Sequence, residues 1–122
     1  MLNIDAKSNL PIFEQIVWQI KSLCLKGVLK PDDKLPSVRQ LSAMLIVNPN
    51  TVSKAYQELE RQGIIETRQG KGTFISSRQN VVPDGKQKEI VLRNLQKAII
   101  DAFYVGLSKD DIHQFVDEQL GT

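Results

Sequence analysis

The stretch from Pro36 to Ile75 constrains the fold of this chain more than any other part of its sequence. It contains two short runs with the apolar spacing of amphipathic helices, separated by the dipeptide Ile46-Val47. Two β-prone runs follow, at residues 64–68 and 73–75, and the segment between them has the glycines that a tight hairpin needs. Helix, short connection, helix and hairpin is the order of a winged helix-turn-helix, so the sequence predicts that fold for this stretch.

Capping residues locate the starts of the two helices. Ser37 is a good N-cap, and Gln40 stands three residues later, which is the capping-box spacing. Asn48 is the next N-cap, with Pro49 at the first helical position and Gly63 after the last. The buried stripe of this second helix is expected to consist of Val52, Ala55, Tyr56 and Leu59.

A further helix is predicted upstream, from Pro11 to about Gly27. Proline is favoured at the first helical position because its missing N–H would have no partner there, and glycine is a common C-terminal stop. Trp18 and Leu25 fall outside the apolar stripe of this helix and give it a second apolar side. Residues 2–10 remain an arm without assigned structure.

The C-terminal part of the chain predicts two more helices. The first has an apolar stripe too wide for a single contact, so it packs on the body and another chain or lies between helices. Ser108, with Asp111 at the capping-box spacing, starts the last helix. The predicted architecture is mainly α with a small β-hairpin wing: a winged helix-turn-helix in residues 1–76, a linker in 77–85 and a short helical domain in 86–122.

Charge is distributed unevenly along the 122 residues, although the net charge is only +2. Residues 1–79 carry 11 Lys and Arg against 7 Asp and Glu, whereas residues 80–122 carry 5 against 7. A basic body with a mildly acidic tail indicates a polyanionic partner for the body. The single cysteine excludes an internal disulfide. The N-terminus has no signal-peptide layout and no apolar run is long enough to span a bilayer, so a cytoplasmic protein without a membrane partner is expected.

The exposed side of the second helix carries side chains suited to DNA. Asn50, Thr51 and Ser53 are short hydrogen-bonding residues that reach base edges or phosphates, and Lys54 and Arg61 add charge. The backbone N–H groups at the helix start offer a phosphate site. The same pattern fits an ordinary solvated face.

The hairpin tip favours DNA, because it combines Arg68 and Lys71, with Arg78 later in the chain, and glycines that permit close approach to a backbone. Arg39, at the start of the preceding helix, is either a plain surface arginine or a further DNA contact.

Four segments resemble the GntR family of bacterial transcriptional regulators. They are LPSVRQLS at 35–42, VNPNTV at 47–52, AYQELE at 55–60 and the run from Gly63 to Phe74. The NPNTV and AYQELE segments and the short tail resemble the YtrA-type subgroup. The resemblance implies homodimerisation through two C-terminal helices and binding to a palindromic operator. It also implies repression, often of genes for an ABC-type transporter.

Position by position, the resemblance implies two sets of functional residues. The DNA-contacting positions are Arg39, Asn48, Asn50, Thr51, Ser53, Lys54, Gly70, Lys71 and Gly72. The implied dimer interface uses the apolar residues of the tail: Leu92, Leu95, Ile99, Phe103, Ile112, Phe115 and Val116.

The sequence departs from the family pattern in three places. Many relatives carry arginine at the positions of Pro49 and Ser53, so different bases are expected to be read. Ile46 stands where a glycine is common in the turn, which leaves the conformation of that turn open. Asp33 replaces a glycine before the helix-turn-helix, with no functional consequence expected.

No arrangement in the sequence indicates an enzyme, a cofactor or a metal site. Gly70-Lys71-Gly72 is followed by strand residues rather than a helix, which argues against a nucleotide-binding loop. His113 stands among acidic residues that fit a solvated face. The tail is too short to enclose a large effector pocket, which leaves a pocket between protomers as the open alternative. The alternative function is a protein-interaction module on the same scaffold, which would need an apolar patch where residues 50–57 are polar.

Overall fold

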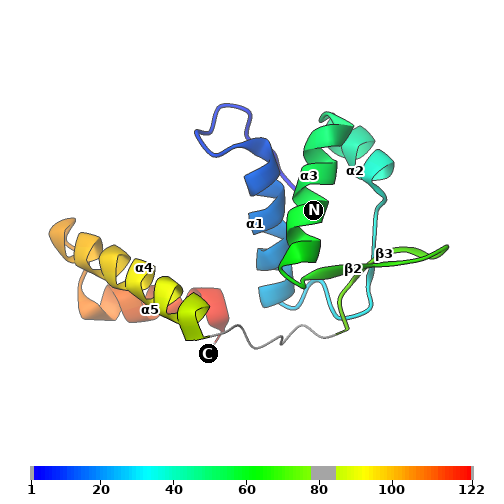
Figure 1. Ribbon diagram of the computed structural model, residues 1–122. Coiled ribbons are helices and arrows are strands. Elements are labelled where there is room, and N and C mark those ends of the chain that lie inside the picture. Colours follow the sequence, from blue (N-terminus) through cyan, green and yellow to red (C-terminus); the bar gives the residue numbers. More distant parts are fainter. Residues whose placement is uncertain (1, 78–84, 122) are drawn as a thin grey trace. The chain divides into compact units, whose positions relative to one another are not determined.

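The computed structural model describes residues 2–77 and 85–121, and the chain divides into two compact units (Figure 1). The first unit contains α1 (Ile12–Leu25), β1 (Lys34–Leu35), α2 (Val38–Leu45), α3 (Pro49–Arg61), β2 (Ile65–Arg68) and β3 (Gly72–Ile75). The second contains α4 (Gly85–Tyr104) and α5 (Lys109–Leu120). The predicted mainly helical fold with a winged helix-turn-helix is confirmed. Most of the predicted linker, residues 78–84, lies outside the described residues.

Helix α3 contributes four buried residues to the first unit, more than α1 or α2. Its inner side packs against α1, α2 and β2, and Figure 1 shows α1 and α3 side by side. Val52, Ala55 and Leu59 have no exposed surface. Burying a large aliphatic side chain stabilises a fold by about 1.5–3 kcal/mol. The remaining buried apolar residues of this core are Ile16, Ile20, Leu29, Leu35, Leu41, Tyr56, Ile65 and Ile75.

The caps predicted for the helix-turn-helix are present. Ser37 Oγ accepts a hydrogen bond from the Gln40 N–H at 3.1 Å, and Gln40 Oε1 accepts one from the Ser37 N–H at 2.9 Å. Asn48 Oδ1 accepts from the Asn50 N–H at 2.8 Å, and Pro49 occupies the first helical position. These bonds satisfy N–H groups that have no partner inside the helix, which explains where α2 and α3 begin.

The wing is part of a three-stranded antiparallel sheet with the order β1-β3-β2. The predicted hairpin of β2 and β3 is confirmed, but the sequence does not predict β1. In β1, Lys34 pairs with Phe74 and Leu35 pairs with Thr73. Two residues carry no periodic signal, so this strand exists only because β3 offers it a pairing edge.

The arm at residues 2–10, which the sequence leaves unassigned, lies along α1. The Gln19 side chain accepts from the Asn3 N–H at 2.9 Å and donates to the Asn3 carbonyl at 2.6 Å. Gln15, only 5% exposed, accepts from the Asp5 N–H and donates to the carbonyls of Asp5 and Leu10. The two glutamines thus anchor the arm by satisfying its backbone.

The second unit is a pair of helices that leaves its apolar side chains open. The predicted capping box of α5 is confirmed: Ser108 Oγ accepts from the Asp111 N–H at 3.0 Å, and Asp111 Oδ2 accepts from the Ser108 N–H at 2.8 Å. None of the residues in α4 and α5 is buried. In the described ranges, no helix is both long and apolar enough to pass through a membrane.

The turn between α2 and α3 resolves the question that the sequence leaves open. Ile46 has φ 54° and ψ 54°, the left-handed conformation that glycine adopts most easily. Its side chain is 92% exposed. The isoleucine therefore takes a backbone geometry that suits glycine, with almost no burial to offset the strain.

Replacing Ile46 with glycine should raise the free energy of unfolding by about 1 kcal/mol, because glycine adopts this φ without strain and no buried contact is lost. Urea denaturation followed by circular dichroism measures the change. Ile46→Ala keeps a Cβ in the same conformation and is the matched control, with a smaller gain expected. A loss of stability in Ile46→Gly would contradict the strain argument.

Candidate DNA-binding surface

The N-terminal part of α3 presents the polar side chains that the sequence singles out. Asn50 is exposed, and Thr51 and Ser53 are half-buried. Asn48 acts as the cap, and its backbone carbonyl accepts from the Thr51 N–H at 3.0 Å. Pro49 has no N–H, and the N–H groups of Asn50 and Thr51 already donate to Asn48. The side chains, rather than these amides, are therefore the groups available to a DNA partner.

The basic residues around α3 differ in how freely they can move. The Arg39 guanidinium is exposed and has no acceptor within the part of the chain that the structure describes. The Lys54 ammonium lies 4.0 Å from the centre of the Phe13 ring of α1, a cation–π contact worth about 0.5–1 kcal/mol at an exposed site. Arg61 donates to Glu58 at 2.7 Å and holds the pKa of that carboxyl below its usual value. Arg39 and Lys54 are thus easier to redirect than Arg61.

The wing tip has the backbone geometry of a tight turn. Gly70 and Gly72 have φ values of 74° and 116°, which glycine alone adopts readily. The Lys71 N–H donates to the Arg68 carbonyl at 2.9 Å, which closes the turn. Lys71 itself is exposed, so the tip presents a lysine flanked by two glycines that have no side chains.

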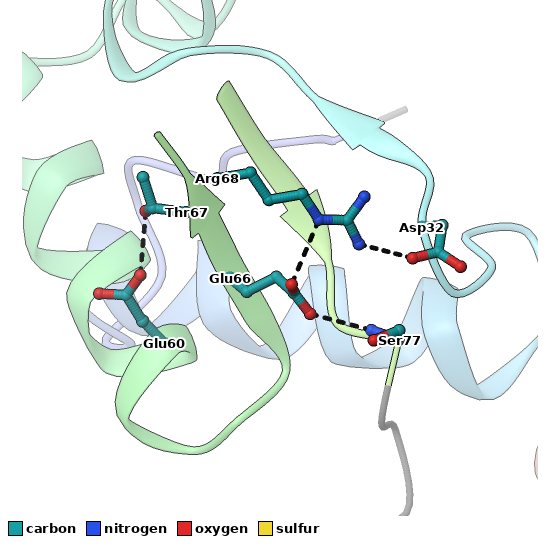
Figure 2. Close-up of polar contacts among 6 residues, drawn as sticks. All are labelled: Asp32, Glu60, Glu66, Thr67, Arg68 and Ser77. Atoms are coloured by element: carbon teal, nitrogen blue, oxygen red, sulfur yellow. Dashed lines mark hydrogen bonds and ion pairs between the residues drawn. The ribbon is translucent and has the colours of Figure 1, made fainter. Parts of the chain in front are cut away.

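Arg68 braces the wing instead of extending from it (Figure 2). Its guanidinium contacts Asp32 at 2.5 Å and Glu66 at 3.2 Å and lies 4.4 Å from the centre of the Phe74 ring. Glu66 also accepts from the Ser77 N–H at 3.0 Å. The Ser77 amide and the Arg68 guanidinium together hold the pKa of the Glu66 carboxyl below its usual range. The sequence groups Arg68 with Lys71 as a DNA-facing cation, and this network is the reason that it is not a free one.

A second contact joins the wing to α3. Thr67 Oγ1 of β2 donates to Glu60 Oε2 of α3 at 2.9 Å (Figure 2). The wing is therefore held on one side by α3 and on the other by the turn that contains Asp32. Neither tie is visible in the sequence, because each depends on the register of the sheet.

Tyr56 links α3 to the start of α2. Its hydroxyl donates to the Pro36 carbonyl at 2.7 Å, and the side chain is 6% exposed. Burial raises the pKa of Tyr56 to about 12. The sequence places Tyr56 in the buried stripe but does not reveal this bond, which ties the two helices of the helix-turn-helix together.

These elements define a class of protein. A helix with a polar, exposed N-terminal side, a shorter helix bonded to it and a basic hairpin on the same body form a winged helix-turn-helix, a fold that binds DNA. The family model described as bacterial regulatory proteins, gntR family, matches residues 12–75. This chain belongs to the GntR family and is a DNA-binding transcriptional regulator, as the sequence motifs predict.

Individual relatives extend the similarity to the tail. The HTH-type transcriptional repressor YtrA of Bacillus subtilis (strain 168) is 51% identical over 119 residues, covering 97% of this chain and 91% of that protein. A transcriptional antiterminator of Listeria monocytogenes EGD-e has a crystal structure with a TM-score of 0.84 at 46% identity, covering 97% of this chain and 88% of that one.

A third relative was crystallised on DNA. The DNA-binding domain of AraR in complex with operator ORX1 gives a TM-score of 0.55 at 29% identity, covering 62% of this chain and 95% of that one. The similarity therefore includes a domain that binds an operator.

Replacing Tyr56 with phenylalanine should lower the free energy of unfolding by about 1 kcal/mol at neutral pH, because the Pro36 carbonyl loses its donor while the ring still packs. The wild type should also lose stability as the pH rises from about 10 through about 12, because the folded state holds the phenol proton more tightly than the unfolded chain does.

Denaturation midpoints between about pH 7 and 12 measure both effects. The alkaline loss tied to Tyr56 should be missing from Tyr56→Phe. Tyr104→Phe is the control, since Tyr104 is 80% exposed on α4. Equal alkaline losses in the wild type and Tyr56→Phe would show that Tyr56 does not stabilise the folded state in this way.

Proposed function

We propose that this protein is a transcriptional repressor that binds a two-fold symmetric operator as a homodimer. In each protomer α3 enters the major groove and the wing follows the neighbouring backbone. The observation that carries the proposal is the exposed apolar surface of α4 and α5. The similarity to YtrA, a protein named as a repressor, supports the direction of regulation.

The apolar surface needs a cover that α4 and α5 do not provide for each other. Six of its residues are between 42% and 70% exposed: Leu92, Leu95, Ile99, Phe103, Phe115 and Val116. With the half-buried Ile112 and other residues, several of them line a groove of about 500 Å³. Apolar patches of this kind are rare on monomers, and a symmetric dimer covers the same patch on both chains at once.

A dimer of this kind sets the form of the DNA site. Two helix-turn-helix units bind half-sites that lie about 34–36 Å apart, one turn of the DNA helix. The domain roles that follow are DNA binding for residues 1–76, connection for 77–85 and dimerisation for 86–122. The proposed targets are genes for a transporter, as the YtrA-type resemblance implies.

The proposed contacts fall into two kinds. Asn50, Thr51 and Ser53 read base edges, because amide and hydroxyl groups match the donors and acceptors of the major groove. Arg39, Lys54 and Lys71 bind phosphates. Asn48 sets the helix start, and Gly70 and Gly72 let the wing approach the DNA. This function needs no catalytic step and no cofactor, and it is carried out in the bacterial cytoplasm, where the DNA lies. The polar side of α3 does not favour an apolar protein-docking role.

Substituting Asn50 and Lys71 should separate base reading from phosphate binding. The operator is first selected from a random DNA pool with the purified protein. Asn50→Ala should then relax discrimination at particular base pairs by about 1–3 kcal/mol, whereas Lys71→Ala should weaken binding to operator and random DNA by the same factor. Gel shifts measure both. Equal losses on both DNAs for Asn50→Ala would exclude base reading by Asn50.

A charge in the α4–α5 surface should dissociate the dimer. Leu95→Lys is expected to sediment as a folded monomer, because Leu95 is already 51% exposed within one chain and is covered only by the partner. Loss of the second half-site contact should weaken operator binding by about a hundredfold or more.

Asn94→Lys is the matched control, since Asn94 shares the polar side of α4 with Lys97 and Asp101 at helical spacing. It should remain a dimer with unchanged affinity. A wild type that sediments as a monomer at the concentrations that bind DNA would refute the dimer proposal.

A further inference from the structure

Lys34 lies beside the wing tip, although it is far from the tip in sequence. β1 pairs with β3 so that Lys34 faces Phe74. The Lys34 side chain then passes over Gly72: a Cβ placed on that glycine would lie 3.1 Å from Lys34 Cε and 3.7 Å from Lys34 Nζ. Since Lys71 precedes Gly72, the ammonium of Lys34 comes to the same tip that presents Lys71.

The sheet gives Lys34 a solvent-facing position. Leu35 is 3% exposed and points into the core, so Lys34, its neighbour on the strand, points to the opposite face. The other cation on that face, Arg68, is bound by Asp32 and Glu66. Lys34 is exposed, and no side chain in residues 2–77 or 85–121 accepts a hydrogen bond or an ion pair from it. Within the described part of the chain the Lys34 ammonium is thus unpaired, whereas the Arg68 guanidinium on the same face is held by two carboxylates.

We infer that Lys34 is a second phosphate-binding cation of the wing and acts next to Lys71 on the same stretch of DNA backbone. The inference rests on the proposed contact between the wing and DNA. Two ammonium groups that share one tip repel each other in the free protein, and a phosphate backbone relieves this repulsion. A lysine carries a compact charge on a flexible stem, which suits a phosphate contact that carries no sequence information.

The φ of 116° at Gly72 favours glycine at this position. A Cβ there would lie 3.1 Å from Lys34 Cε, so the end of the lysine stem would have to shift by a few tenths of an ångström. The backbone conformation, rather than this contact, is therefore the main reason for glycine at the tip.

The test compares charge removal with charge retention at Lys34. Lys34→Met keeps the length of the stem and removes the charge, Lys34→Gln does so with a polar end, and Lys34→Arg keeps the charge. Apparent affinities for the selected operator and for a random duplex are measured by gel shift over a salt series. Melting temperatures confirm that each full-length variant is folded.

Lys34→Met and Lys34→Gln should weaken binding to both DNAs by the same factor. Each protomer loses one phosphate contact, so the slope of log affinity against log salt should become shallower by about 0.9 per protomer on the DNA. The affinity difference from wild type should therefore be largest at low salt. Between about 50 and 200 mM salt it should shrink about threefold to fourfold per protomer. Lys34→Arg should keep the wild-type slope.

Lys26→Met is the matched control. Lys26 caps the C-terminal end of α1, and Lys21, five residues earlier, donates to Gln62 at the C-terminal end of α3 at 2.7 Å. A helix of this length separates its two ends by about 20 Å, so Lys26 lies far from the N-terminal part of α3. Its replacement should change neither affinity nor slope.

The outcomes separate this inference from the function on which it rests. If Lys71→Ala changes the slope and the neutral Lys34 variants do not, the inference is wrong and the wing contact stands. If none of these variants changes the slope, the wing contact itself is wrong, and the inference falls with it. A loss confined to the operator would assign Lys34 to base reading and overturn the phosphate role.

Discussion

The burial of one side of α3 is the constraint on which the rest of the first unit depends. Val52, Ala55 and Leu59 are fully enclosed by α1, α2 and β2. A helix fixed on one side has no freedom to rotate, so the side chains on its other side are presented in a fixed direction. The hydrogen bond from the Tyr56 hydroxyl to the Pro36 carbonyl also fixes the start of α2 relative to α3. The direction in which Asn50 points is therefore a consequence of core packing.

Local signals in the sequence predict the helices and the hairpin, but not the contacts that position them. A capping box such as the one at Ser37 spans four residues, and its partners are already neighbours in the chain. Arg68 and Asp32 are 36 positions apart and meet only when the strands pair in one register. β1 and the placement of Lys34 depend on the same register. At Ile46 the sequence shows an unusual residue, and only the backbone dihedral shows that it adopts the glycine conformation.

A count of charges along the sequence treats all basic residues of the first unit as equivalent. The structure separates them into cations that are already paired and cations that are exposed. Arg61 and Arg68 are bound to carboxylates, and Lys54 rests on an aromatic ring. Arg39 and Lys71 are exposed. Surface ion pairs contribute little to stability, but they decide which cations remain available to a partner. The number of free cations, rather than the net charge, is what the salt dependence of binding would report.

The hydrogen bond between Ser77 and Glu66 has a mechanical consequence. Ser77 is the last described residue of the first unit, and Glu66 accepts from both its N–H and the guanidinium of Arg68. A pull transmitted along the chain from the C-terminal side would therefore load the wing sheet before it reached α3. Helix α3 is held by the core, whereas the wing bears the attachment point, so tension from the tail would act on the wing sheet first.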